Sequence, residues 1–143
     1  SKKAADFGSG AGFPGLVLAV MAQTALPHLH MTLVESDKRK ATFLSQAARQ
    51  LGLSVTVRSD RAEVLLRLGA DVVTARALAP LTTLCGIAAR HMAAGGVAIF
   101  PKGTQADKEL EDAATQWQFQ AEKTQSKTDP AGRILTLKSI QHA

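Results

Sequence analysis

The segment Asp6–Gly15, with the sequence DFGSGAGFPG, brings four glycines into ten residues. Glycines between a strand and a helix let the backbone turn tightly and let a ligand approach the free N–H groups at the start of the helix. Two spacings coexist here, G-x-G-x-x-G at Gly10, Gly12 and Gly15, and D-x-G-x-G-x-G at Asp6, Gly8, Gly10 and Gly12. Either spacing predicts a site for an adenosine-containing cofactor.

The two spacings point to different cofactors. G-x-G-x-x-G is the dinucleotide fingerprint and would indicate an NAD-dependent oxidoreductase. D-x-G-x-G-x-G resembles motif I of class I methyltransferases, where Asp6 could face the methionine end of S-adenosylmethionine. Glu35 fits both, because a carboxylate 20 residues after Gly15 can accept hydrogen bonds from the ribose hydroxyls of either cofactor. An oxidoreductase would also need a substrate region with an acid–base residue, for which 143 residues leave little room.

A run of three cations, Lys38, Arg39 and Lys40, is expected in the first turn of a helix. The helix dipole disfavours a cation there by about 0.3–1 kcal/mol. Three unfavourable residues in succession indicate a function, and contact with phosphate groups is the simplest one. The alternative is a surface cluster whose charge is offset by Glu35 and Asp37.

Two further cations are expected at the carboxyl ends of strands, beside the cofactor crevice. Arg76 could bind a carboxylate or a phosphate, and Lys102 could hold a phosphate. These two residues are candidates for positioning rather than for chemistry, and both could instead be solvated charges. Arg133, on the last expected strand, would extend the basic surface.

The composition indicates a globular domain and gives no sign of a metal site or a membrane span. The chain has 143 residues, 45% of them hydrophobic, and a formal net charge of +5, which fits one globular domain with an anionic partner. Cys85 is the only cysteine, and the four histidines lack the spacing of a helical zinc site, so no metal site is expected. The sequence has no apolar run long enough to span a bilayer. We expect a cytoplasmic protein and, without a heptad pattern, a monomer.

The elements that must position these residues alternate between strands and helices. The expected strands are 4–7, 31–35, 55–58, 71–75, 97–100, 117–124 and 133–140. The expected helices are 14–25, 37–51, 62–68, 80–92 and 104–114, the last with a capping box at Thr104 and Asp107. Turns are expected at Gly95–Gly96 and at 128–132. This order predicts an α/β fold with a doubly wound, mostly parallel sheet that ends in an antiparallel hairpin.

From Ala5 to Ile140 the chain resembles the ribosomal RNA small subunit methyltransferase G family, also called glucose-inhibited division protein B. The FPG that follows the glycines and the TARA at the end of a strand are much more specific than the glycines alone. The segments that carry the resemblance are Asp6–Gly15, Thr32–Leu44, Arg61–Glu63, Thr74–Ala77, Pro101–Gly103 and Gly132–Lys138.

The resemblance implies a class I methyltransferase fold, S-adenosylmethionine as cofactor, and N7 of a guanine in 16S rRNA, free or within the small subunit, as substrate. The cofactor contacts it implies fall on Asp6, Gly8, Gly10, Gly12, Phe13, Glu35, Ala62, Glu63 and Arg76. With RNA as the substrate, the candidate RNA contacts are Lys38, Arg39, Lys40, Lys102 and Arg133. Lys102 could hold guanine O6, and Arg76 an RNA phosphate. The family has a helical segment before the first strand, where this chain has only Ser1–Ala5. We therefore expect residues 1–143 to form a single methyltransferase domain without that segment. A non-catalytic RNA-binding module is a further alternative.

Overall fold

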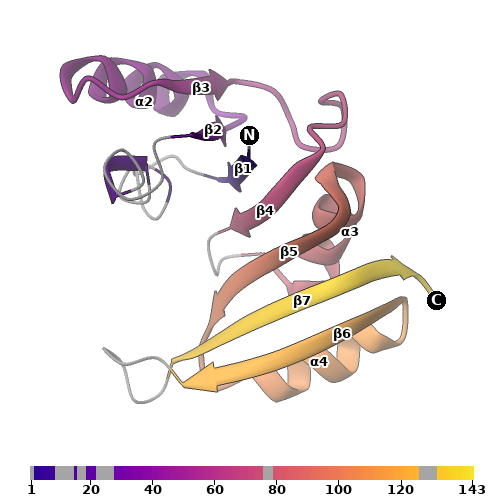
Figure 1. Ribbon diagram of the computed structural model, residues 1–143. Helices are drawn as coiled ribbons and strands as arrows, with labels where there is room; N and C mark the ends of the chain where they lie inside the picture. The colour runs from indigo at the N-terminus through magenta and orange to yellow at the C-terminus, as the bar shows by residue number, and fades with distance from the viewer. Residues whose placement is uncertain (1, 9–14, 16–18, 22–27, 76–78, 126–131) are drawn as a thin grey trace.

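The computed structural model describes residues 2–8, 15, 19–21, 28–75, 79–125 and 132–143. Within these residues seven strands form one sheet in the order β3-β2-β1-β4-β5-β7-β6 (Figure 1). The strands are β1 (Lys2–Phe7), β2 (Leu29–Val34), β3 (Val55–Arg58), β4 (Ala70–Ala75), β5 (Met92–Lys102), β6 (Trp117–Gln125) and β7 (Arg133–His142). The helices with described bounds are α2 (Lys38–Gln50), α3 (Leu81–His91) and α4 (Ala106–Ala114).

The sheet is parallel from β3 to β5 and antiparallel where β7 pairs with β5 and β6. The predicted doubly wound sheet with an antiparallel end is therefore confirmed. Strand order reverses beside β1, because the chain adds β2 and β3 on one side and β4 and β5 on the other. At such a reversal the connections leave to opposite faces, which opens a crevice at the carboxyl ends of the strands.

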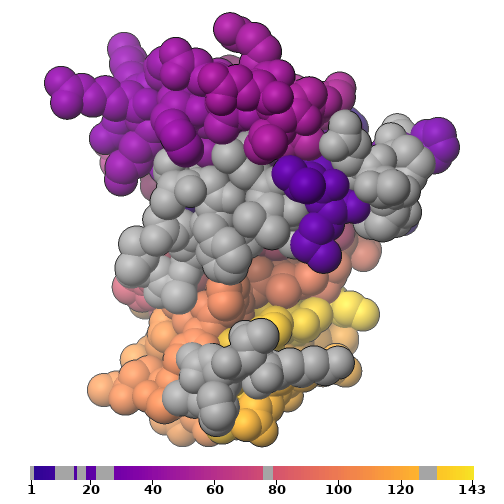
Figure 2. All heavy atoms as spheres, turned by 90° about the vertical axis from the view of Figure 1, so that its left-hand side faces the viewer, coloured from indigo at the N-terminus to yellow at the C-terminus, as the bar shows by residue number. Residues whose placement is uncertain are grey.

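Side chains of the strands alternate between two apolar cores, one on each face of the sheet. On one face Ala4, Met31 and Leu33 pack against α2 through Leu44 and Ala48. On the other face residues of β1, β4, β5 and β7 pack against α3 and α4. Seen from the side, α2 lies at one end of the molecule and the α4–β6–β7 region at the other (Figure 2).

Three local expectations are wrong. The helix expected at 62–68 is a single turn, in which Arg61 O accepts hydrogen bonds from the amides of Val64 and Leu65. Ala62 O, which would accept from the Leu66 amide in a continuing helix, instead accepts from Nε2 of His91 in α3, and Gly69 has a φ of 61°. Both features end the helical conformation within one turn.

Gly95 and Gly96 do not end a segment but lie inside the longer strand β5. Gly95 has a φ of 79°, and the register of β4 with β5 shifts between Ala70 and Val72. The glycines therefore allow a bulge inside a strand rather than a turn before one.

Thr104 does not cap α4, whose N-cap is Gln105 without a side-chain hydrogen bond. The amide of Ala106 donates to Gly103 O (3.2 Å), so a separate turn precedes the helix and moves its start beyond Thr104. The turn expected at 128–132 lies outside the described residues except for Gly132.

Candidate active site at the carboxyl edge of the parallel strands

A pocket of about 400 Å³ opens at the carboxyl ends of β1, β2 and β4, beside the reversal of strand order. Its volume falls in the range of small-molecule sites, about 300–1,000 Å³. The described residues that line it are Phe7, Gly8, Val34, Glu35, Ser36, Lys40, Asp60, Arg61, Ala62, Glu63, Ala75, Ala79, Leu84 and Ile87.

Gly8 forms the floor of the pocket where β1 ends. Its φ of 75° lies in the left-handed region, and within the described residues no atom beyond its chain neighbours would lie within 4 Å of a Cβ at this position. Its amide donates to Val34 O (2.8 Å), which fixes the turn against β2. Glycine is therefore required by the backbone, and the open space above it leaves room for a ligand to approach.

Glu35 follows β2 directly and is the buried carboxylate of the pocket, with 9% of its surface exposed. Its own amide donates to Arg58 O (2.9 Å), and its Oε2 accepts a hydrogen bond from the amide of Asp37 (2.9 Å). Within the described residues this amide is the only hydrogen-bond partner of the carboxylate. A carboxylate can accept about four hydrogen bonds, so Glu35 retains acceptor sites that suit the hydroxyls of a ribose.

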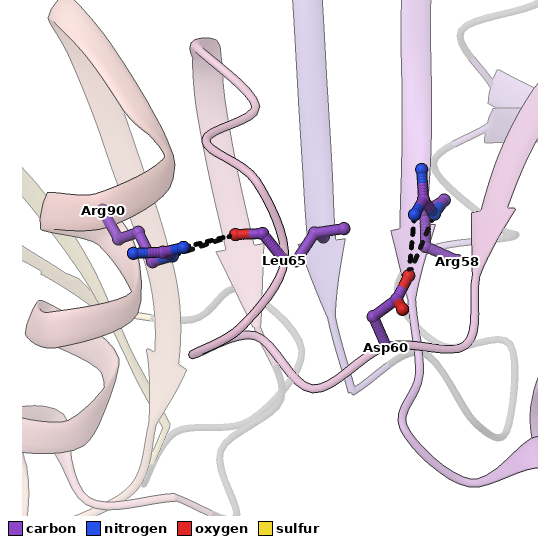
Figure 3. A network of polar contacts seen from close by, with 4 residues as sticks. All are labelled: Arg58, Asp60, Leu65 and Arg90. Atoms are coloured by element: carbon purple, nitrogen blue, oxygen red, sulfur yellow. Dashed lines mark hydrogen bonds and ion pairs between the residues drawn. The ribbon is translucent and has the colours of Figure 1, made fainter.

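The loop after β3 forms a second wall of the pocket through Asp60, Arg61, Ala62 and Glu63. Arg58 fixes the start of this loop, because its Nε and Nη2 both lie 3.0 Å from Asp60 Oδ2 (Figure 3). Ala62 and Glu63, two of the predicted cofactor contacts, are therefore brought to the same pocket as Gly8 and Glu35.

Apolar side chains close the remaining sides, with Leu84 and Ile87 contributed by α3 and Ala79 by the segment before it. None of these three residues was predicted to line the site, and Lys40, which also lines it, was predicted only as an RNA contact. The spacing of three between Leu84 and Ile87 places both on one helix face, which was the available signal. It does not by itself distinguish a pocket wall from an ordinary core.

Asp6 is fully buried but is not among the described residues that line the pocket. It accepts a hydrogen bond from Thr74 Oγ1 (2.6 Å), its direct partner in the pairing of β1 with β4. The described contact thus ties the two central strands together. Gly10, Gly12, Phe13 and Arg76, also predicted as cofactor contacts, lie outside the described residues.

Lys102 ends β5 as predicted, but it is buried, with 5% of its surface exposed. Its Nζ donates to Ala79 O (2.6 Å) and pairs with Glu109 Oε1 (3.0 Å), which also accepts from the amide of Leu81 (3.0 Å). This arrangement joins β5, α4 and the start of α3. It suits a positioning residue for the segment that bears Ala79 better than a contact to RNA.

The other predicted RNA contacts lie nearer the surface. Lys38, Arg39 and Lys40 are exposed in the first turn of α2, as predicted, and Lys40 also lines the pocket. Asp37 caps the helix by accepting hydrogen bonds from the amides of Arg39 and Lys40. Arg133 is half-buried and lies opposite Lys102 in the pairing of β5 with β7.

In the described part of the chain no group of His, Cys, Asp and Glu side chains could hold a metal ion. No helix among the described residues is long and apolar enough to cross a membrane.

Solved structures show the same architecture. The ribosomal protein L11 methylase of Lactobacillus delbrueckii subsp. bulgaricus superposes with a TM-score of 0.73 at 18% identity, over 95% of this chain and 68% of that one. A SAM dependent methyltransferase from Aquifex aeolicus superposes with a TM-score of 0.72 at 12% identity, over 95% of this chain and 81% of that one. These likenesses establish the fold, which is the predicted class I methyltransferase fold.

Sequence comparison identifies the family. The family model GidB, described as rRNA small subunit methyltransferase G, matches residues 1–139. Ribosomal RNA small subunit methyltransferase G of Cereibacter sphaeroides is 50% identical over 137 residues, which cover 96% of this chain and 66% of that protein. This chain thus spans just under two thirds of that relative's length. It belongs to the rRNA small subunit methyltransferase G (GidB) family.

Proposed function

We propose that this chain binds S-adenosylmethionine and transfers its methyl group to N7 of a guanine in 16S rRNA. The observation that carries the proposal is the pocket at the strand-order reversal, with Gly8 as its floor and the Glu35 carboxylate at the end of β2. The family to which the chain belongs and its methyltransferase fold support the same function. Neither favours an oxidoreductase or a non-catalytic RNA-binding module.

The described residues fit the cofactor. Glu35 would accept hydrogen bonds from the ribose hydroxyls, since it is buried and retains free acceptor sites. The backbone at Ala62 and Glu63 would lie along the adenine, and Gly8 would let the cofactor approach the end of β1. Asp6, Gly10, Gly12, Phe13 and Arg76 complete the proposed contact set on the strength of the family resemblance.

S-adenosylmethionine, when bound, supplies an electrophilic methyl group on a sulfonium. Guanine N7 offers an in-plane lone pair and carries no proton, so the reaction requires no general base. The chain's task is to hold N7 and the methyl carbon about 3–3.5 Å apart and in line with the sulfur. Phe7, Leu84 and Ile87 keep water from one side of the pocket, while Arg76 and Lys102 are positioning candidates. A pocket without a described His or Cys base agrees with this chemistry.

The RNA would be attracted by the exposed first turn of α2. Lys40 lines the pocket, and Lys38 and Arg39 precede it in the same helical turn. Arg133 would extend this surface beyond β5, and the net charge of +5 favours association with RNA. Lys102 would act through Ala79 and Glu109 rather than through RNA contact. The proposed partner is 16S rRNA, free or within the small ribosomal subunit.

We also propose that residues 1–143 form one methyltransferase domain that acts as a monomer in the cytoplasm. The single sheet with a core on each face supports one folding unit.

The direct test is methyl transfer from S-adenosylmethionine to undermethylated 16S rRNA and to small subunits, followed by nucleoside mass spectrometry. We expect 7-methylguanosine with the wild-type chain and at least a tenfold lower kcat/KM for the cofactor with Glu35→Ala, because a hydrogen bond to a charged acceptor contributes about 1.5–3 kcal/mol. Methylation at another position would contradict the proposed substrate. RNA binding without any transfer would favour the RNA-binding module.

A further inference from the structure

The carboxyl end of α3 holds the loop that forms the second wall of the pocket. This loop, residues 59–65, has only one turn of its own, made by the two hydrogen bonds that Arg61 O accepts. Arg90 and His91, the last two residues of α3, both bond to main-chain oxygens of the loop (Figure 3 shows Arg90). The loop is therefore shaped by contacts from outside its own sequence.

His91 is fully buried, and its Nε2 lies 2.8 Å from Ala62 O. A carbonyl oxygen can only accept, so Nε2 carries the proton and donates. Within the described residues the other ring nitrogen, Nδ1, has no hydrogen-bond partner, and a proton placed there would be a buried donor without an acceptor, which favours the neutral imidazole. A buried imidazole with one unsatisfied nitrogen costs more than an apolar side chain of similar size. The hydrogen bond from Nε2 to Ala62 O offsets part of this cost.

The ring of His91 also packs against Phe7, with ring centroids 5.0 Å apart. Phe7 and Ala62 both line the pocket, one from β1 and the other from the loop. His91 therefore touches two walls of the pocket from behind, although it does not line the pocket itself. A change in its position would move both walls.

Arg90 makes the second attachment. Its Nε and Nη2 donate to Leu65 O at 3.0 and 2.8 Å, and Arg67 Nη1 donates back to Arg90 O at 3.3 Å. A guanidinium that donates two bonds to one carbonyl restricts the loop more than a single bond would. Together the two residues fix the loop at Ala62 and at Leu65, on both sides of Glu63.

We infer that Arg90 and His91 are positioning residues for the adenosine end of the cofactor, acting through the backbone of the loop at residues 61–65. The inference rests on the proposed function, which places the adenine along Ala62 and Glu63. Neither residue would touch the cofactor. Their effect would be to hold the loop in its binding conformation before the ligand arrives, which lowers the entropic cost of binding.

The test compares His91→Phe, His91→Gln and Arg90→Met with the wild-type chain, and uses Arg49→Met as the matched control. Arg49 is an exposed arginine in the last turn of α2 and does not line this pocket. Circular dichroism establishes that each variant is folded. Amide hydrogen exchange at Val64 and Leu65, measured without ligand, reports on the loop, and calorimetry with S-adenosylhomocysteine reports on binding.

We expect His91→Phe and Arg90→Met to speed exchange at Val64 and Leu65 and to raise the Kd for S-adenosylhomocysteine about tenfold, as loss of a net hydrogen bond implies. His91→Gln, whose amide can donate to Ala62 O, should recover most of the affinity. If His91→Phe fails to fold, Arg90→Met and His91→Gln carry the comparison.

Wild-type affinity in both Arg90→Met and His91→Phe would overturn the inference, even if loop exchange became faster. Equal weakening by Arg49→Met would also overturn it, because the effect would not be specific to the loop. Failure of the wild-type chain to bind would instead overturn the proposed function, and with it the ligand role of these residues. The two failures are therefore distinguishable.

Discussion

Three buried polar side chains each hold one loop at the carboxyl edge of the sheet. Glu35 accepts from the amide of Asp37 after β2, His91 donates to Ala62 O after β3, and Lys102 donates to Ala79 O before α3. Each of these loops contributes residues to the pocket. Because a buried polar group is costly without its partner, these bonds make the loop conformations strongly preferred.

The buried state of His91 predicts a pH dependence of stability. Burial lowers the pKa of His91 below its ordinary 6.5, and the nearby Arg90 and Arg67 lower it further, although the bond to Ala62 O opposes them. The unfolded chain then takes up a proton that the folded chain resists, so stability falls as pH falls below about 6.5. The slope for one such proton is at most about 1.4 kcal/mol per pH unit.

Urea unfolding gives the free energy of unfolding at pH 7.5 and at pH 5.5, and the change between the two pH values is compared in the wild type and in His91→Phe. Between the two pH values the wild-type chain should lose more stability than His91→Phe, which lacks the titrating group, by up to about 1.4 kcal/mol. Equal losses would show that His91 titrates alike in the folded and unfolded states. Comparison with the variant removes the contribution of carboxylates common to both proteins.

At the scale of elements, Gly86 and Gly96 differ in the space that a larger side chain would find. In α3, a Cβ at Gly86 would meet only Trp117 Cζ2, at 3.5 Å, which is an ordinary contact. In β5, a Cβ at Gly96 would lie 2.7 Å from Met92 Cγ, 2.9 Å from Ala93 O and 3.0 Å from Asp71 O. The two positions should therefore respond to alanine in opposite directions.

Gly86→Ala should stabilise the chain by about 0.5–1 kcal/mol, because alanine favours the helix more than glycine does. Gly96→Ala should cost about 1–3 kcal/mol, since two of the atoms it would meet belong to the backbone and cannot rotate away. Chemical denaturation of both variants beside the wild type checks the pair. Tolerance of alanine at Gly96 would contradict the bulge geometry of β5.

The first turn of α2 makes a separate prediction about RNA. Lys38→Ala/Arg39→Ala should weaken binding of 16S rRNA and reduce the slope of log K against log salt by about 1–2, because each phosphate contact contributes about 0.7–0.9 to it. Lys40 is left unchanged because it lines the pocket. Affinity for S-adenosylhomocysteine should stay at the wild-type value.

Arg49→Ala/Lys108→Ala is the control, since it removes the same charge from exposed positions outside that turn. Filter binding across a salt series distinguishes the two double variants. An equal loss of RNA affinity in both would mean that net charge, and not the position of the cations in α2, attracts the RNA.

On the scale of the whole molecule, the alternation of strands and helices predicted a doubly wound, mostly parallel sheet with an antiparallel end, and the structure confirms it. Helix α2 begins and ends within a residue of its predicted bounds. Gly8 and Glu35 were predicted from the glycine motif and its spacing, Ala62 and Glu63 from the family resemblance, and the four residues line one pocket. Local sequence carries the first two predictions because Gly8 and Glu35 each follow directly on a strand.

The other residues of the site could not be predicted from the sequence, because their positions depend on contacts between elements that are distant along the chain. Leu84 and Ile87 have the spacing of any buried helix face, and only the docking of α3 makes them pocket walls. The single turn at 62–64 has a sequence that suits a helix, but His91 of a later element bonds to Ala62 O, the carbonyl that a second helical turn would need. The sequence around Lys102 is compatible with a surface cation, whereas in the structure the residue is buried and pairs with Glu109 of α4.

The most direct test of the account is calorimetric titration of this chain with S-adenosylmethionine, S-adenosylhomocysteine and NAD, in wild type, Gly8→Arg and Gly69→Arg. Both glycines have a positive φ and open space around a Cβ, but only Gly8 lines the pocket. The account predicts saturable binding of the two sulfur-containing ligands, none of NAD, loss of binding in Gly8→Arg and its retention in Gly69→Arg. Binding of NAD alone, or undiminished binding by Gly8→Arg, would contradict it.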